Sequence, residues 1–150
     1  MGHFLNCTSS DVLDIERQRK KIFIQGNSLI RKFYMCTIDV KLTLFNSFCS
    51  PLYTAHLWSK YTQTSITNLY RAYHNTLKLL LGVSKREHTS PICAYLNVRS
   101  CPAVIRNRFF RFMERIRNSS NSIIVAIDRS SIYYQSTMRK HWRSLLYTNV

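Results

Sequence analysis

The sequence predicts an all-α protein, and three observations support this prediction. Only three glycines and three prolines occur among 150 residues, which is few for a β-rich chain that must turn often. Hydrophobic residues make up 45% of the chain, which is too large a share for a disordered tail. Apolar residues also recur every three or four positions behind helix-capping side chains. We expect one compact unit with a three-helix bundle over 1–84 and a basic helical extension over 85–150, and residues 1–5 are compatible with a short strand.

The first helix is expected to begin near residues 9–11, where Ser, Ser and Asp form a typical N-cap sequence. Asp14 and Glu16 follow in the first turn, where the helix dipole favours acidic side chains. Heptad spacing of apolar residues then predicts an amphipathic helix of roughly 25 residues. Its buried stripe is expected to run through Val12, Ile15, Arg19, Ile22, Gly26, Leu29, Phe33 and Cys36. Its other face carries Arg17, Lys20, Lys21, Arg31 and Lys32.

Residues 42–59 contain no Lys, Arg, Asp or Glu, and three interpretations compete: a membrane span, a buried core helix and a functional groove. A span needs about 20 mainly apolar residues, and the polar side chains and the proline in this stretch disfavour insertion. We expect the central helix of the bundle here, capped by Thr37 and covered by its neighbours. Pro51 predicts a kink or break near Cys49, because proline cannot donate a backbone hydrogen bond. No ligand role is expected for Tyr53, His56 or Trp58, which should be core or edge residues.

The third helix is expected to begin at Thr64 or Ser65 and to be followed by Gly82, a favourable C′ residue. Its buried stripe should contain Ile66, Leu69, Tyr73, Leu77 and Leu80. A polar connector over 83–90 then separates the bundle from the extension.

Two later signals, Ser90 before Pro91 and Ser100 near Pro102, predict further helix starts. After Pro102 an apolar stripe is expected at Ile105, Phe109, Phe112 and Ile116. Arginines fall largely outside that stripe, at Arg106, Arg108, Arg111, Arg115 and Arg117. The remaining expectations are a break at 118–122, a short buried helix at 123–127 and a last helix at about 131–147.

The charge of the chain points to a polyanionic partner. Twenty-two Lys and Arg face seven Asp and Glu, which gives a formal charge of +15. Nucleic acid is the first partner that such an excess indicates, and an anionic membrane surface is the second. A third interpretation is a basic protein without a specific ligand.

Several kinds of chemistry find no support in the sequence. The five cysteines are odd in number and widely spaced, and no secretory signal precedes them, so we expect reduced thiols in the cytoplasm or nucleus. No C-x-x-C or H-x-x-x-H pair indicates a metal site, and no glycine-rich loop indicates a bound nucleotide cofactor. No paired carboxylates suggest the divalent-metal chemistry of polymerases or nucleases. We therefore expect no enzyme activity, no cofactor, no metal and no small-molecule substrate.

An ordered series of segments carries a resemblance to a known family. It consists of MGHFL, DIERQRKKIFIQGNSLIRKF, VKLTLFNSFCSPLYTAHLW, LYRAYHNTLKLLLGVSKREHTSP and RNRFFRFMERI. The series resembles the carboxy-terminal part of LINE-type (non-LTR) retrotransposon reverse transcriptases and covers essentially the whole chain. In that family a palm with a catalytic Y-x-D-D precedes an L-G-H segment, a helical thumb and a helical extension. Gly2 and His3 would match the end of L-G-H, with Met1 in place of the leucine.

The resemblance implies a thumb and extension without the palm, and therefore a truncated fragment that does not polymerise. It also implies sequence-independent binding of RNA or an RNA–DNA duplex through the phosphate backbone. The candidate binding residues lie on two helix faces and are Arg17, Lys20, Lys21, Arg31, Arg106, Arg108, Arg111 and Arg115. These cations could instead be solvated outer faces of a bundle. The sequence is also compatible with an inert retrotransposon remnant and with a small membrane-associated protein.

Overall fold

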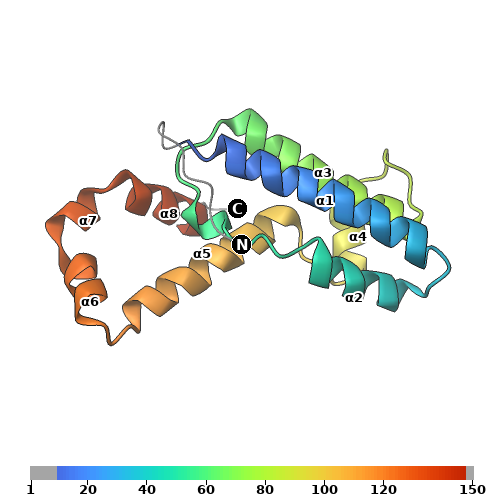
Figure 1. Ribbon diagram of the computed structural model, residues 1–150. Coiled ribbons are helices and arrows are strands. Elements are labelled where there is room, and N and C mark those ends of the chain that lie inside the picture. Colours follow the sequence, from blue (N-terminus) through green and yellow to red (C-terminus); the bar gives the residue numbers. More distant parts are fainter. Residues whose placement is uncertain (1–9, 148–150) are drawn as a thin grey trace.

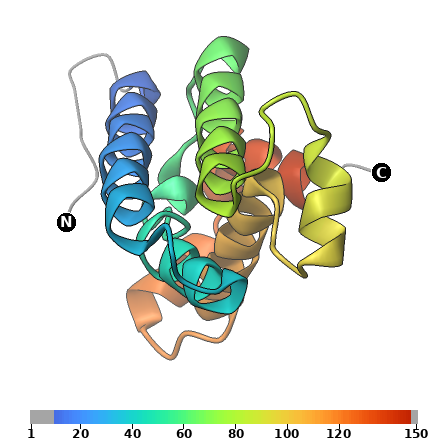
Figure 2. The same cartoon turned by 90° about the vertical axis from the view of Figure 1, so that its right-hand side faces the viewer.

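The computed structural model describes residues 10–147, and every regular element in that range is helical (Figure 1). The all-α prediction is therefore confirmed. The strand considered for residues 1–5 lies outside the described residues. Figures 1 and 2 show an elongated group of three helices with a second group of helices, from the later part of the chain, packed below and beside it.

Three helices form the first group: α1 (Val12–Phe33), α2 (Ile38–Phe48) and α3 (Gln63–Leu81). Helices α1 and α3 lie side by side and run in the same direction (Figures 1 and 2). Helix α2 and the segment after it run back in the opposite direction, so that α3 begins beside the start of α1. The predicted stripe of α3 is buried throughout, and α1 buries Ile15, Ile22 and Leu29 against it. Gly82 has a φ of 72°, the left-handed conformation expected after the last turn of α3.

A glycine allows the closest approach between α1 and α3. A Cβ atom added to Gly26 would lie 2.1 Å from Cγ2 of Thr76, and the Thr76 side chain is itself buried. No side chain larger than hydrogen fits there without moving the Thr76 side chain or one of the helices.

The expected single helix over 42–59 is wrong. Helix α2 ends at Phe48, and after a turn the chain forms only one short 3-10 turn, η1 (Ala55–Leu57). The predicted break near Cys49 is confirmed: the N–H groups of Cys49 and Ser50 both reach the Phe45 carbonyl, and Pro51 follows.

Burial in this stretch is also only partial. Leu52 and Trp58 are buried, whereas Phe48 and Tyr53 are about half exposed, so α2 is not a central, fully covered helix. Within 10–147, no helix is long and apolar enough to cross a membrane.

Two acidic residues at the start of α1, Asp14 in its first turn and Asp11 at its N-cap, hold the segment after α2 in place. The carboxylate of Asp14 is fully buried and accepts hydrogen bonds from Thr54 Oγ1 (2.8 Å) and Trp58 Nε1 (2.9 Å). Asp11, the residue before α1, accepts from the backbone N–H groups of Ser59 and Lys60. Asp14 does lie in the first turn, as expected, but its main role is to anchor a distant segment.

The second group begins with α4 (Thr89–Tyr95), whose N-cap is His88, two residues before the Ser90 that the sequence predicts as the cap, and continues with α5 (Cys101–Arg117). Helix α4 is followed by Asn97, which adopts a left-handed φ of 51°. Ile105 and Phe109 of α5 are buried as predicted, and α5 packs on η1 and α3.

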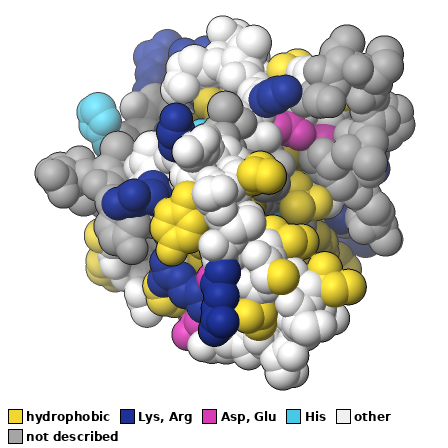
Figure 3. Space-filling model, turned by 90° about the vertical axis from the view of Figure 1, so that its left-hand side faces the viewer, with side chains coloured by type: hydrophobic (Ala, Val, Ile, Leu, Met, Phe, Trp, Pro, Cys, Tyr) yellow, Lys and Arg dark blue, Asp and Glu magenta, His cyan; other side chains and the backbone are white. Residues whose placement is uncertain are grey.

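The last three helices differ from the prediction. The expected buried helix at 123–127 is α6 (Ser122–Arg129), which has no buried residue; Ile123 is 68% exposed. Figure 1 explains this, since α6 and α7 (Ser131–Gln135) project away from the bundle. Figure 3 faces that side, where exposed hydrophobic side chains lie among Lys and Arg. The expected single helix at 131–147 is interrupted at Ser136, whose extended backbone separates α7 from α8 (Thr137–Tyr147).

Candidate nucleic-acid interface

The eight predicted binding residues fall into separate places on the surface. On α1, Arg17, Lys20 and Lys21 line one shallow groove, whereas Arg31 lines a second groove further along the helix. On α5, Arg108 and Arg111 line a cavity, whereas Arg106 and Arg115 are exposed and do not line it. The two expected faces are therefore each divided.

Acidic neighbours offset part of the positive charge on the α1 face. Arg17 forms an ion pair with Asp14, and Arg19 forms one with Glu16. The Arg19 guanidinium, by hydrogen bonding to Glu16, lowers the pKa of that carboxyl, so the pair stays charged. Two of the cations at this end of α1 are therefore engaged by neighbouring carboxylates.

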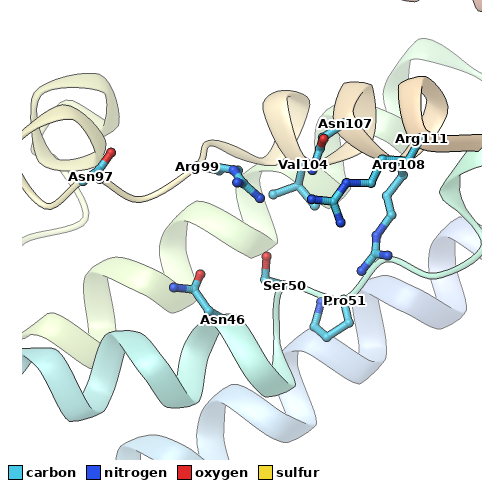
Figure 4. A pocket seen from close by; sticks show the side chains of 9 residues that line it. All are labelled: Asn46, Ser50, Pro51, Asn97, Arg99, Val104, Asn107, Arg108 and Arg111. Atoms are coloured by element: carbon cyan, nitrogen blue, oxygen red, sulfur yellow. The ribbon is translucent and has the colours of Figure 1, made fainter. Parts of the chain in front are cut away.

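The cavity beside α5 is strongly basic. Its volume is about 450 Å³, and it lies between α5, the loop before α5 and the end of α2 (Figure 4). Three arginines line it: Arg108 and Arg111 from α5, and Arg99 from the loop. Arg99 and Arg108 extend from opposite sides into the space near Ser50, while Arg111 extends toward Pro51 (Figure 4). The residues that line the cavity include no Asp or Glu.

A buried tyrosine ties two walls of this cavity together. The hydroxyl of Tyr73 donates to the Arg99 carbonyl at 3.1 Å and lies 3.2 Å from the Ser50 hydroxyl, from which it can accept. Burial raises the pKa of the Tyr73 phenol, so the hydroxyl keeps its proton and remains a donor. Tyr73 thus fixes the loop before α5 against the end of α2. The core position predicted for Tyr73 is confirmed, and its hydroxyl adds this second role.

The start of α5 is fixed in a similar way. The backbone N–H of Cys101, the first residue of α5, donates to Nε2 of His74 at 3.2 Å. Burial, together with the nearby Lys78 charge, lowers the pKa of His74, which favours the neutral ring that can accept this bond. The arginines of α5 are therefore held at a defined position relative to α3.

Tyr53 connects the α1 face with the cavity. The guanidinium carbon of Arg108 lies 5.2 Å from the centre of the Tyr53 ring, and Nζ of Lys21 lies 5.9 Å from the same centre. Both distances are within the range of cation–π attraction. We call the surface formed by Lys21, Tyr53, Arg99, Arg108 and Arg111 the basic junction. It unites parts of the two predicted faces in one place.

Sequence reasoning missed Arg99 and Tyr53. Arg99 lies outside every helix, so no amphipathic pattern could mark it, although the left-handed Asn97 marks the tight turn before it. The sequence predicts Tyr53 as a core or edge residue, yet it is 53% exposed between two cations. The loop before α5 brings Arg99 near Arg108, and the packing of α5 on the segment around η1 brings Tyr53 there.

Within the described residues, no group of three or more His, Cys, Asp or Glu side chains could hold a metal ion. Comparison with known proteins gives no match: no family model, no curated protein and no solved structure is similar to this chain. The resemblance to LINE-type reverse transcriptases therefore stays a prediction.

Proposed function

We propose that this chain binds nucleic acid through the phosphate backbone, without reading base sequence. The observation that carries the proposal is the basic junction, where cations from α1 and α5 meet at Tyr53 beside a cavity without acidic side chains. Lys and Arg neutralise phosphates irrespective of sequence. The formal charge of +15 supports the proposal, because it attracts a polyanion over a longer range.

RNA or an RNA–DNA duplex is the ligand we propose, in keeping with the resemblance to a reverse-transcriptase thumb and extension. The half-exposed ring of Tyr53 suits single-stranded RNA in particular, because an unpaired base can stack on an aromatic face between two cations. The role we propose is to hold a strand and not to catalyse a reaction. The two acids at the start of α1 fit that view, since Asp11 and Asp14 are engaged in holding the segment after α2.

A salt series tests this function. We expect the affinity for a short RNA–DNA duplex to fall linearly with salt on a double logarithmic plot, by about 0.9 per phosphate contact. The double variant Arg108→Gln/Arg111→Gln should reduce that slope by about 2, because each arginine of the junction neutralises one phosphate. Fluorescence anisotropy of a labelled duplex at several salt concentrations measures both quantities.

The matched control is Arg106→Gln/Arg115→Gln, which removes the same charge from the same helix outside the cavity. We expect this control to change the slope by less than half as much. Equal effects of the two double variants would mean that only overall charge matters and that the junction is no site. Absence of salt-dependent binding by the unaltered chain would favour an inert protein.

A further inference from the structure

The size of the cavity beside α5 suits a small molecule better than a single ion. Its volume of about 450 Å³ falls in the range of roughly 300–1,000 Å³ that is typical of small-molecule sites. Such sites are usually mostly apolar. This one is mainly polar, with asparagines from three different segments besides its arginines: Asn46, Asn97 and Asn107. The ligand it fits is therefore highly polar.

The charge of the cavity suits a phosphate monoester better than the diester of an internal backbone phosphate. Three arginines face the space, and no acid among the lining residues offsets them. A diester carries one negative charge, whereas a monoester carries about −1.5 to −2 at neutral pH. Arginine also pairs with phosphate through two parallel N–H donors. A monoester has one more non-bridging oxygen than a diester, so it can accept from more arginines at once.

The remaining polar groups suit the sugar and base of a nucleotide. Each asparagine amide offers both donors and an acceptor, and the Ser50 hydroxyl, which donates to Tyr73, still offers its oxygen as an acceptor. Sugar hydroxyls and base edges need this mixture, whereas phosphate oxygens need mainly donors. Tyr73 holds Ser50 and the Arg99 backbone at fixed positions, so the wall of the cavity exists before any ligand arrives.

We infer that this cavity binds one nucleotide that carries a terminal phosphate monoester, with Arg99, Arg108 and Arg111 around the phosphate. The nucleotide is either the phosphorylated end of a strand or a free mononucleotide. This inference deepens the proposed function and rests on it for the strand end. It adds a distinction that backbone binding alone does not make, namely between phosphorylated and unphosphorylated ends.

The test uses three single-stranded RNAs of one sequence, bearing a 5′-phosphate, a 3′-phosphate or hydroxyls at both ends. We expect either the 5′-phosphorylated or the 3′-phosphorylated RNA to bind about tenfold more tightly than the hydroxyl form, since one charge-assisted contact to a phosphate is worth roughly that factor. Arg99→Gln should abolish the difference. Arg115→Gln removes the same charge outside the cavity and should preserve it. Circular dichroism of both variants confirms that the helices remain.

A competition arm separates the two sources of the nucleotide. Adenosine monophosphate should displace the phosphorylated RNA, and adenosine should not. Displacement of the RNA by adenosine monophosphate, together with a preference for a phosphorylated end, supports a strand-end site. Binding of adenosine monophosphate without binding of any RNA supports the cavity inference but overturns the proposed function. Equal, salt-dependent binding of all three RNAs, unaffected by Arg99→Gln, overturns the cavity inference and leaves the proposed function in place. Binding of no RNA and no monophosphate overturns both.

Discussion

The carboxylate of Asp14 links the first turn of α1 to a segment forty residues further along the chain. It is fully buried and accepts from Thr54 and Trp58, whose side chains are buried with it. Gln18 adds a longer contact to Thr54 at 3.4 Å. Because Tyr53 directly precedes Thr54, this network also determines where the Tyr53 ring lies relative to α1. A buried polar network of this kind stabilises a fold only while all its members are satisfied.

Replacing Asp14 should therefore destabilise the protein more than replacing an exposed acid. Asp14→Ala leaves the Thr54 hydroxyl and the Trp58 indole N–H buried without this acceptor, and we expect a loss of about 3 kcal/mol in the free energy of unfolding. Asp39→Ala is the control, since Asp39 is exposed in the first turn of α2 and should cost about 0.5 kcal/mol. Urea unfolding followed by circular dichroism measures both. Similar losses for the two variants would show that the buried network adds little.

At the scale of elements, the contact between α1 and α3 depends on two small groups. Gly26 presents no side chain, and the Cγ2 methyl of Thr76 occupies the space that a Cβ would need. The parallel packing of these helices forms a large part of the core, with Ile22 and Leu29 on one side and Leu69 and Leu77 on the other. A change of one methyl group at the contact must therefore move a helix or a buried side chain.

Gly26→Ala should destabilise the protein by about 1–3 kcal/mol, even though alanine favours the helix more than glycine does. Thr76→Ser alone removes the opposing methyl and should cost about 1 kcal/mol. The double variant should be more stable than the sum of the single effects implies, because the added Cβ then fills the vacated space. Thermal and urea unfolding of the three variants give the coupling. Simple additivity would show that the two residues do not meet.

Local patterns predicted most of the helices. The stripes of α1, α3 and α5 repeat at helical spacing over long segments, and capping residues such as Gly82 mark their ends. Patterns failed where a helix depends on its neighbours. The apolar run of α6 packs on α5 and α7 without burying any of its residues, and no periodicity can indicate how completely a helix will be covered. The uncharged stretch 42–59 has the pattern of one helix because part of it is buried. Pro51 ends the helix there, and the hydrogen bonds to Asp11 and Asp14 hold the residues after it in a non-helical path.

The candidate site was only partly predictable for a related reason. Arg108 and Arg111 follow from the basic face of α5, but their convergence with Arg99 depends on the loop that precedes the helix. Lys21 and Arg108 are 87 positions apart and meet only through Tyr53. Distances of this kind are set by tertiary packing, which a single sequence without a structure does not reveal.

At the scale of the whole molecule, two histidines connect parts that are distant in sequence. His74 of α3 accepts the N–H that begins α5. His141 of α8 lies 3.2 Å from the hydroxyl of Tyr61, so it ties the last helix to the segment before α3. Trp142 then packs on Phe112 of α5, with ring centres 5.4 Å apart. Burial lowers the pKa of both histidines; Lys78 adds to this effect at His74, whereas the negative charge of Asp11 opposes it at His141.

These shifts predict that the fold weakens in mild acid. In the folded protein the pKa values of both histidines lie below the ordinary value of 6.5. At pH values between the folded and the unfolded pKa, the unfolded chain binds more protons than the folded one, so stability falls as the pH drops. The urea midpoint should therefore be lower at about pH 5.5 than at about pH 7.5. The variant His74→Gln/His141→Gln should flatten this dependence, because glutamine does not titrate and its carbonyl oxygen can still accept. His88→Gln, at an exposed histidine, is the control and should leave the slope unchanged. An equal slope in the double variant and the unaltered chain would place the acid sensitivity in other groups.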